Sequence, residues 1–125
     1  MENVYENALA HRLRKAGLDV KQQHPIKVYD EDGTLLGDYL ADLLVADELI
    51  IELKAVKTLG GEHEAQILGY LKSARREHGL LVNFGSYRFE IRKFIWQEGV
   101  TAKSTENTKS GITGMVSALL AFLVA

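Results

Sequence analysis

The spacing of hydrophobic positions changes along the chain, and these changes predict the order of its elements. In residues 2–16 apolar side chains such as Leu9 and Leu13 recur every three or four positions, which predicts a helix that Gly17 ends. In residues 19–29 the spacing becomes two, which predicts a strand, and Pro25 favours an edge position. A turn signal follows, and then residues 34–45 and 49–56 are typical of two more strands. We therefore expect an antiparallel meander of three strands.

The second half of the chain returns to helical spacing and then to strands. Residues 62–77 are periodic at three and four, the run LLVNF is typical of a short buried strand, and residues 87–95 are typical of a last strand. This order predicts an α/β or α+β fold with a mixed sheet, in which the second helix can cross over to a parallel strand. No internal repeat is visible.

The last 27 residues differ in composition from the rest. We expect a domain over residues 1–98, a polar linker over 99–111 and an apolar helix or tail over 112–125. The tail is shorter than the roughly 20 apolar residues that a spanning helix needs, so no membrane contact is expected. A packed helix, or one that contacts a partner or a second copy of the chain, is the interpretation adopted, with a cropped membrane anchor as the alternative.

Composition narrows the class of protein. A chain of 125 residues with 46% hydrophobic and 26% charged residues suits one globular domain. It has no cysteine, which excludes disulfides and thiolate metal sites and agrees with a reducing cytosol. The N-terminus lacks the apolar core of a signal peptide, so we expect a cytoplasmic protein. The formal net charge of -2 gives no general attraction to nucleic acid, although local basic groups exist.

Candidate chemistry is concentrated in the stretch GDYLADLLVADELIIELKA. If residues 46–48 form a three-residue hairpin loop, counting back along both strands places Asp42 directly opposite Glu52. Directly opposed side chains have Cβ atoms about 4.5–5.5 Å apart, which lets two carboxylates hold one hard cation. Lys54 follows Glu52 by two positions and therefore points to the same face of the sheet. The three side chains are predicted to share one surface.

This combination of residues suits phosphodiester hydrolysis. A Mg²⁺ or Mn²⁺ ion held by Asp42 and Glu52 would stabilise charge on the phosphate and lower the pKa of a bound water, and the Leu53 carbonyl could add a ligand. Lys54 could orient the attacking water or stabilise charge. A solvated strand with a plain Glu52–Lys54 salt bridge is the alternative. The apolar neighbours of both carboxylates favour the metal site, because buried carboxylates need a partner.

Two helices offer further polar side chains. On the second predicted helix His63, Gln66 and Tyr70 form a polar strip at helical spacing, which could border the site and contact a substrate. Each of them is, when isolated, more often a surface or partly packed residue, and His63 alone is not a ligand. Glu6 on the first helix lies beside the apolar stripe, where it is either a buried polar anchor or a further acid.

The order of these residues resembles that of a known nuclease group. Asp42, then Glu52-Leu53-Lys54, then Gln66-x-x-x-Tyr70 is similar to the signature of the RecB-like branch of the PD-(D/E)XK nucleases. More closely, VYENAL, YLADLLV, IIELKAV, HEAQILGYL and GLLVNFG resemble the GxxExxY protein family, over roughly residues 2–95. The naming motif of that family fits Glu2 and Tyr5, but its leading glycine and the helix before it have no counterpart here.

The resemblance implies a restriction-endonuclease-like core, a mixed β-sheet flanked by helices. It further implies a Mg²⁺-dependent site at Asp42, Glu52 and Lys54, supported by Glu6, Gln66 and Tyr70. Nucleic acid, with DNA preferred to RNA, is the substrate to expect. Two other functions compete with a nuclease: a catalytically silent module that binds nucleic acid or protein on the same fold, and a structural partner that docks through residues 112–125.

Overall fold

The sheet of this protein joins all of its strands in the order in which they occur in the sequence. A computed structural model describes residues 2–86, 89–98 and 103–104. The strand order is β1-β2-β3-β4-β5-β6, and β3 and β4 are the parallel pair, whereas the other neighbours are antiparallel. The elements are α1 (Glu2–Lys15), β1 (Val20–Tyr29), β2 (Leu35–Val45), β3 (Leu49–Lys54), α2 (Gly61–Ala74), β4 (His78–Asn83), β5 (Glu90–Ile95) and β6 (Lys103–Ser104).

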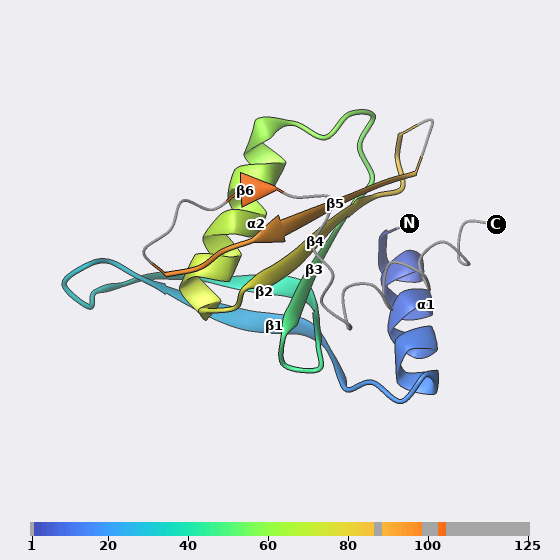
Figure 1. Ribbon diagram of the computed structural model, residues 1–125, viewed down its shortest axis with the longest axis horizontal. Helices are drawn as coiled ribbons and strands as arrows, with labels where there is room; N and C mark the ends of the chain where they lie inside the picture. The colour runs from blue at the N-terminus through green and yellow to red at the C-terminus, as the bar shows by residue number, and fades with distance from the viewer. Residues whose placement is uncertain (1, 87–88, 99–102, 105–125) are drawn as a thin grey trace.

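The sheet is the middle layer, with one helix on each face (Figure 1). Leu9 and Leu13 of α1 pack with Leu43 and Ile51 on one face. On the other face Ile67 and Leu71 of α2 pack with Leu44, Ile50 and Leu81. Neighbouring residues of a strand point to opposite faces, which is why Leu43 and Leu44 belong to different cores. The predicted mixed sheet flanked by helices is confirmed, and it is consistent with a restriction-endonuclease-like fold.

The hairpin between β2 and β3 has the predicted register. Val45 pairs with Leu49, so the loop contains residues 46–48. Ala46 and Asp47 have φ of 52° and 56°, in the left-handed region that tight hairpin turns with a right-handed twist require. The edge position expected from Pro25 is also observed, because β1 is the first strand of the sheet.

Several boundaries differ from those expected. The strand expected over residues 49–56 ends at Lys54. The second helix ends at Ala74 rather than at residue 77, because Arg75 adopts a left-handed conformation with φ of 53° and its N–H bonds back to the last turn. β5 begins at Glu90, and residues 87–88 of the expected strand lie outside the described part. Lys103 and Ser104, within the expected linker, add the short strand β6 against β5. The expected tail over residues 112–125 lies outside the described residues.

The second strand of the β1–β2 ribbon has two unlike halves. Its inner half carries core residues such as Leu43 and Val45, whereas residues 35–40 of β2 are all exposed, even where Tyr39 pairs with the buried Ile26 of β1. The ribbon extends beyond the body of the sheet (Figure 1). In the residues that the structure describes, no helix is both long and apolar enough to cross a membrane.

Candidate active site

Asp42 and Glu52 are tied together across the end of the β2–β3 ladder. The paired residues end with Leu43 and Ile51, and Asp42 and Glu52 are the next residues on the two strands. There the backbone N–H of Asp42 donates to Glu52 Oε1 at 2.9 Å, and the N–H of Leu53 donates to Asp42 Oδ2 at 2.7 Å. Each carboxylate therefore accepts a main-chain hydrogen bond from the other strand, which fixes both side chains at the place that hairpin counting predicts.

The surroundings of Asp42 and Glu52 disfavour the ionised form of both carboxyl groups. Glu52 is only 4% exposed, and burial raises its pKa to about 8, with the nearby charge of Asp42 as the second cause. Burial also raises the pKa of Asp42, against the lowering effect of the Leu53 N–H. A buried carboxylate whose ionisation is disfavoured by a neighbouring acid is a common arrangement where a cation is bound.

Glu6 approaches the pair from α1 through two glutamines. It is 7% exposed, and its oxygens accept from Gln22 Nε2 at 2.8 Å and Gln23 Nε2 at 2.6 Å. Gln23 Nε2 also donates to Asp42 Oδ1 at 3.2 Å, so one amide bridges α1 and β2. Glu6 thus lies close enough for its charge to raise the pKa values of Asp42 and Glu52 further.

Lys54 contacts the second helix rather than the neighbouring carboxylate. Its Nζ donates to Gln66 Oε1 at 2.7 Å, and in the described part of the chain it forms no ion pair with Glu52. Gln66 also hydrogen-bonds Tyr70, one turn further along α2. Burial and then the charge of Glu52 raise the pKa of Tyr70 to about 12, so its hydroxyl keeps its proton at neutral pH. α2 therefore brings Gln66 and Tyr70 to the Lys54 side of the cluster.

His63 forms its contacts within the first turn of α2. Its Nδ1 accepts from the backbone N–H of Gly60 at 3.0 Å, and Nε2 lies 3.8 Å from Glu62. These contacts organise the first turn of α2, where backbone N–H groups lack helical partners. A contact of His63 with substrate stays a prediction.

The donor atoms around Asp42 and Glu52 fit a hard divalent cation. Within residues 2–86, 89–98 and 103–104 no three His, Asp or Glu side chains converge closely enough to form a metal site by themselves. Mg²⁺ accepts two carboxylates together with carbonyl and water ligands. Leu53 N–H points towards β2 and the Lys54 carbonyl towards β4, where it accepts from Phe84 N at 2.8 Å. Because the N–H and C=O of one strand residue point to the same side, the Leu53 carbonyl faces the Asp42 side.

On the β4 side of β3, hydrogen bonds from the side chain of Asn83 hold the chain that follows β3. We call this group of bonds the Asn83 latch, and the sequence did not predict it. Asn83 of β4 is fully buried, and its Oδ1 accepts from Val56 N and Gly85 N, each at 3.0 Å. Its Nδ2 donates to the Val56 carbonyl at 2.8 Å. These bonds hold the chain directly after Lys54. A lone Asn in the apolar run LLVNF was the available signal, whereas nothing in the KQQHP segment indicates that Gln22 and Gln23 hold Glu6.

The sequence profile of the PD-(D/E)XK nuclease superfamily matches residues 1–94, which include every residue of the cluster. The chain belongs to the PD-(D/E)XK nuclease superfamily. Members of this superfamily generally use divalent metal ions, and they act on nucleic acid. The narrower resemblance to the RecB-like branch and the GxxExxY family stays a prediction.

Comparison with solved structures finds a chain of similar fold and adds no function. A structure described as "Crystal structure of SSO0001" superposes with a TM-score of 0.56 at 16% sequence identity. The match covers 98% of this chain but 57% of that chain, so this chain spans less than two thirds of its length. No curated protein matches the chain at a significant level.

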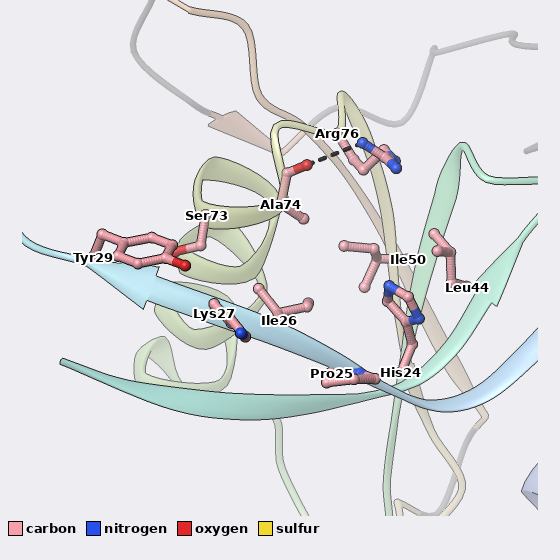
Figure 2. A pocket seen from close by; sticks show the side chains of 10 residues that line it. All are labelled: His24, Pro25, Ile26, Lys27, Tyr29, Leu44, Ile50, Ser73, Ala74 and Arg76. Atoms are coloured by element: carbon pink, nitrogen blue, oxygen red, sulfur yellow. Dashed lines mark hydrogen bonds between the residues drawn. The ribbon is translucent and has the colours of Figure 1, made fainter. Parts of the chain in front are cut away.

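A separate hollow lies under the C-terminal end of α2 (Figure 2). It has a volume of about 230 Å³, and basic side chains, among them Lys27 and Arg76, line it beside Ile26 and Ile50. Arg76 already donates to the Ala74 carbonyl, which the dashed line marks, and to Asp47. None of the clustered acids of this PD-(D/E)XK protein lines the hollow, and the candidate active site is therefore the Asp42–Glu52 cluster.

Proposed function

We propose that this protein is a metal-dependent nuclease that hydrolyses phosphodiester bonds in DNA, or in RNA. The observation that carries the proposal is the buried carboxylate of Glu52 beside the partly buried Asp42, whose charge raises the pKa of Glu52, with Lys54 two positions along the same strand as Glu52. Superfamily membership supports the same reaction class. A cytoplasmic location, the domain limits and a contact through residues 112–125 stay predictions.

Asp42 and Glu52 would hold the Mg²⁺ or Mn²⁺ ion, with the Leu53 carbonyl as a further ligand. Such an ion supplies positive charge beside the phosphate oxygens and lowers the pKa of a bound water. The two carboxylates are held by main-chain N–H groups of the opposite strand, so their orientation is fixed before substrate binds. Preorganised polar groups of this kind avoid reorganisation during the reaction.

Lys54 would act on the water or on the phosphate. Its ammonium has three N–H donors, and Gln66 accepts one of them. The remaining donors can orient the attacking water or stabilise charge that develops on the phosphate. Because the Asn83 latch fixes the chain after Lys54, the position of this ammonium is set by the fold rather than by a mobile loop.

Glu6, Gln66 and Tyr70 would support the site. Glu6 contributes negative charge next to Asp42, which favours the approach of a cation. Tyr70 keeps its proton at neutral pH and can donate a hydrogen bond to a phosphate oxygen. Gln66 connects Tyr70 to Lys54 and so couples the helix to the strand.

The test measures metal binding and cleavage in one set of variants. Asp42→Asn and Glu52→Gln are expected to lose Mn²⁺ binding in calorimetry and metal-dependent cleavage of mixed DNA and RNA substrates. Lys54→Ala is expected to keep metal binding and to lose cleavage by at least about 100-fold. Asp38→Asn, an exposed carboxylate on the same strand as Asp42, is the matched control and should change neither.

A catalytically silent binding module is the other candidate, which the net charge of -2 favours because it gives little general attraction to nucleic acid. Wild-type protein that binds neither Mg²⁺ nor Mn²⁺, with or without nucleic acid, would establish the silent module. Loss of folding in the Asp42 and Glu52 variants would instead assign these residues a structural role.

A further inference from the structure

Gln23 is the residue of the cluster with the most unusual backbone. Its φ is 51°, a left-handed value that residues other than glycine seldom adopt. The β1–β2 ladder pairs Gln22 with Leu43 and His24 with Ala41, and between these pairs Gln23 and Asp42 are not joined. Strained conformations of this kind persist where the surrounding structure requires them, often at functional sites.

The strain directs the Gln23 amide between two carboxylates. Nε2 donates to Glu6 Oε1 at 2.6 Å and to Asp42 Oδ1 at 3.2 Å. A primary amide nitrogen has two N–H groups, so these two acceptors use both of them. The other oxygen of Asp42, Oδ2, is already taken by Leu53 N.

The amide therefore occupies a place that suits a cation. Three acids, Glu6, Asp42 and Glu52, lie close enough for their charges to affect one another. The group that bridges two of them is uncharged, and it offsets their repulsion only through hydrogen bonds. A divalent cation would neutralise the same oxygens far more effectively, but it cannot share them with the two N–H groups of an amide.

We propose that the Gln23 amide competes with the divalent cation for Asp42 Oδ1, so that Gln23 is a positioning residue that sets metal affinity. This inference rests on the proposed function, because it concerns the same metal centre. Without metal, Gln23 bridges Asp42 and Glu6. When metal binds, the amide releases Asp42 Oδ1, and the cost of that release weakens the affinity.

Gln22 provides a matched control. Its Nε2 donates to Glu6 Oε2 and to Asn7 Oδ1, each at 2.8 Å, and among the described residues it forms no hydrogen bond with Asp42. Both glutamines belong to the same strand and hold the same glutamate. They differ in one respect: the Gln23 amide also donates to Asp42 Oδ1, the oxygen that the cation needs, and the Gln22 amide does not.

The experiment compares Gln23→Met with Gln22→Met, since methionine keeps the length of the side chain and removes the amide. Mn²⁺ affinity is measured by calorimetry, and the melting temperature is measured with chelator and with saturating Mn²⁺. Gln23→Met is expected to bind Mn²⁺ about tenfold more tightly, the equivalent of one charge-assisted hydrogen bond. It should melt at a lower temperature than wild type with chelator, and Mn²⁺ should close that difference. Gln22→Met should leave the affinity unchanged.

Three results decide the matter. Unchanged or weaker Mn²⁺ binding by Gln23→Met, with normal binding by wild type and Gln22→Met, would overturn this inference and leave the nuclease proposal standing. Absence of binding in wild type would overturn both. If Gln23→Met does not fold, Gln23→Asn tolerates positive φ but is too short to bridge both carboxylates, and the same tightening is expected of it.

Discussion

Two buried polar clusters flank the end of β3, and they are built on opposite principles. On the β4 side, Asn83 is neutral and fully buried, and its amide makes four hydrogen bonds, to Val56 twice, to Gly85 and to Glu90. On the β2 side, Glu52 is almost as buried but ionisable, and the neighbouring charge that affects its pKa most is that of another acid, Asp42. The first cluster is complete within the protein, whereas in the second, among the described residues, Lys54 lies near the acids without forming an ion pair with either Asp42 or Glu52.

This difference separates stability from function. A buried polar group that finds all its partners within the fold strengthens the fold and specifies its geometry. A buried acid beside other acids weakens the fold, and such residues persist where they serve a site. We therefore infer that the Asn83 latch fixes the backbone around the candidate active site. The Asp42–Glu52 pair would be the reactive part of that site.

The largest expected effect is the pH dependence caused by Glu52. Its pKa is about 8 in the folded protein against 4.5 ordinarily, so above pH 4.5 the unfolded chain releases a proton that the folded protein keeps. The free energy of unfolding should therefore fall as pH rises from about 4.5 to about 8, by on the order of 5 kcal/mol. Glu52→Gln should flatten this decline in urea unfolding curves.

Asp47, on the same hairpin, is the control for that experiment. Hydrogen bonding and the charge of Arg76 lower its pKa, so its contribution is present at neutral pH and is lost as pH falls through the acid range. Asp47→Asn should change only the acid limb of the stability curve. A Glu52→Gln variant that keeps the full decline between pH 4.5 and 8 would contradict the assignment of this effect to Glu52.

The next effect concerns the latch. Asn83→Ala leaves Val56 N, the Val56 carbonyl and Gly85 N without their partner, and should cost roughly 3 kcal/mol of unfolding free energy in urea titrations. Asn7→Ala, at an exposed position, should cost much less. If Asn83→Ala were as stable as Asn7→Ala, the bonds of the latch would contribute little and the contrast between the two clusters would fail.

The smallest pair of effects compares two glycines. A Cβ on Gly85 would lie 2.3 Å from Val56 N and 2.4 Å from the Ala55 carbonyl carbon, so Gly85→Ala must move the backbone beside the latch. We expect a loss of about 2 kcal/mol in thermal or urea unfolding. Gly69 lies in α2, where an added Cβ would meet no described atom within 4 Å outside its own helix backbone, and Gly69→Ala should stabilise the protein by about 0.5–1 kcal/mol. Equal effects of the two substitutions would show that the chain near Lys54 is not tightly held.

Local patterns were sufficient to predict most of the fold. The hairpin register follows from a three-residue loop between two apolar strands, because a slip by one residue would turn Leu43 and Ile51 away from their core. The same register puts Asp42 opposite Glu52. The end of α2 was misplaced because the left-handed turn at Arg75 has no glycine to mark it.

The connections within the site could not be predicted in the same way. Lys54 reaching Gln66, and Gln23 reaching Glu6, join residues 12 and 17 positions apart, and these contacts depend on how the helices pack on the sheet. The spacing of residues along a single helix or strand does not show how that helix or strand packs against the others. An alternating strand also gives no sign that Gln23 adopts positive φ, since glutamine has no special preference for it.

In the outer half of the β1–β2 ribbon, residues 35–40 of β2 are paired with β1 but all exposed, with the ring of Tyr39 against Tyr70 as a contact to α2. A two-stranded ribbon without a core is only marginally stable in water. Amide hydrogens in residues 35–40 can therefore exchange with solvent through local opening, whereas those of Leu43 and Leu44 are released only when the domain as a whole unfolds. The ribbon can fray and re-form while the strand segment that carries Asp42 stays in place.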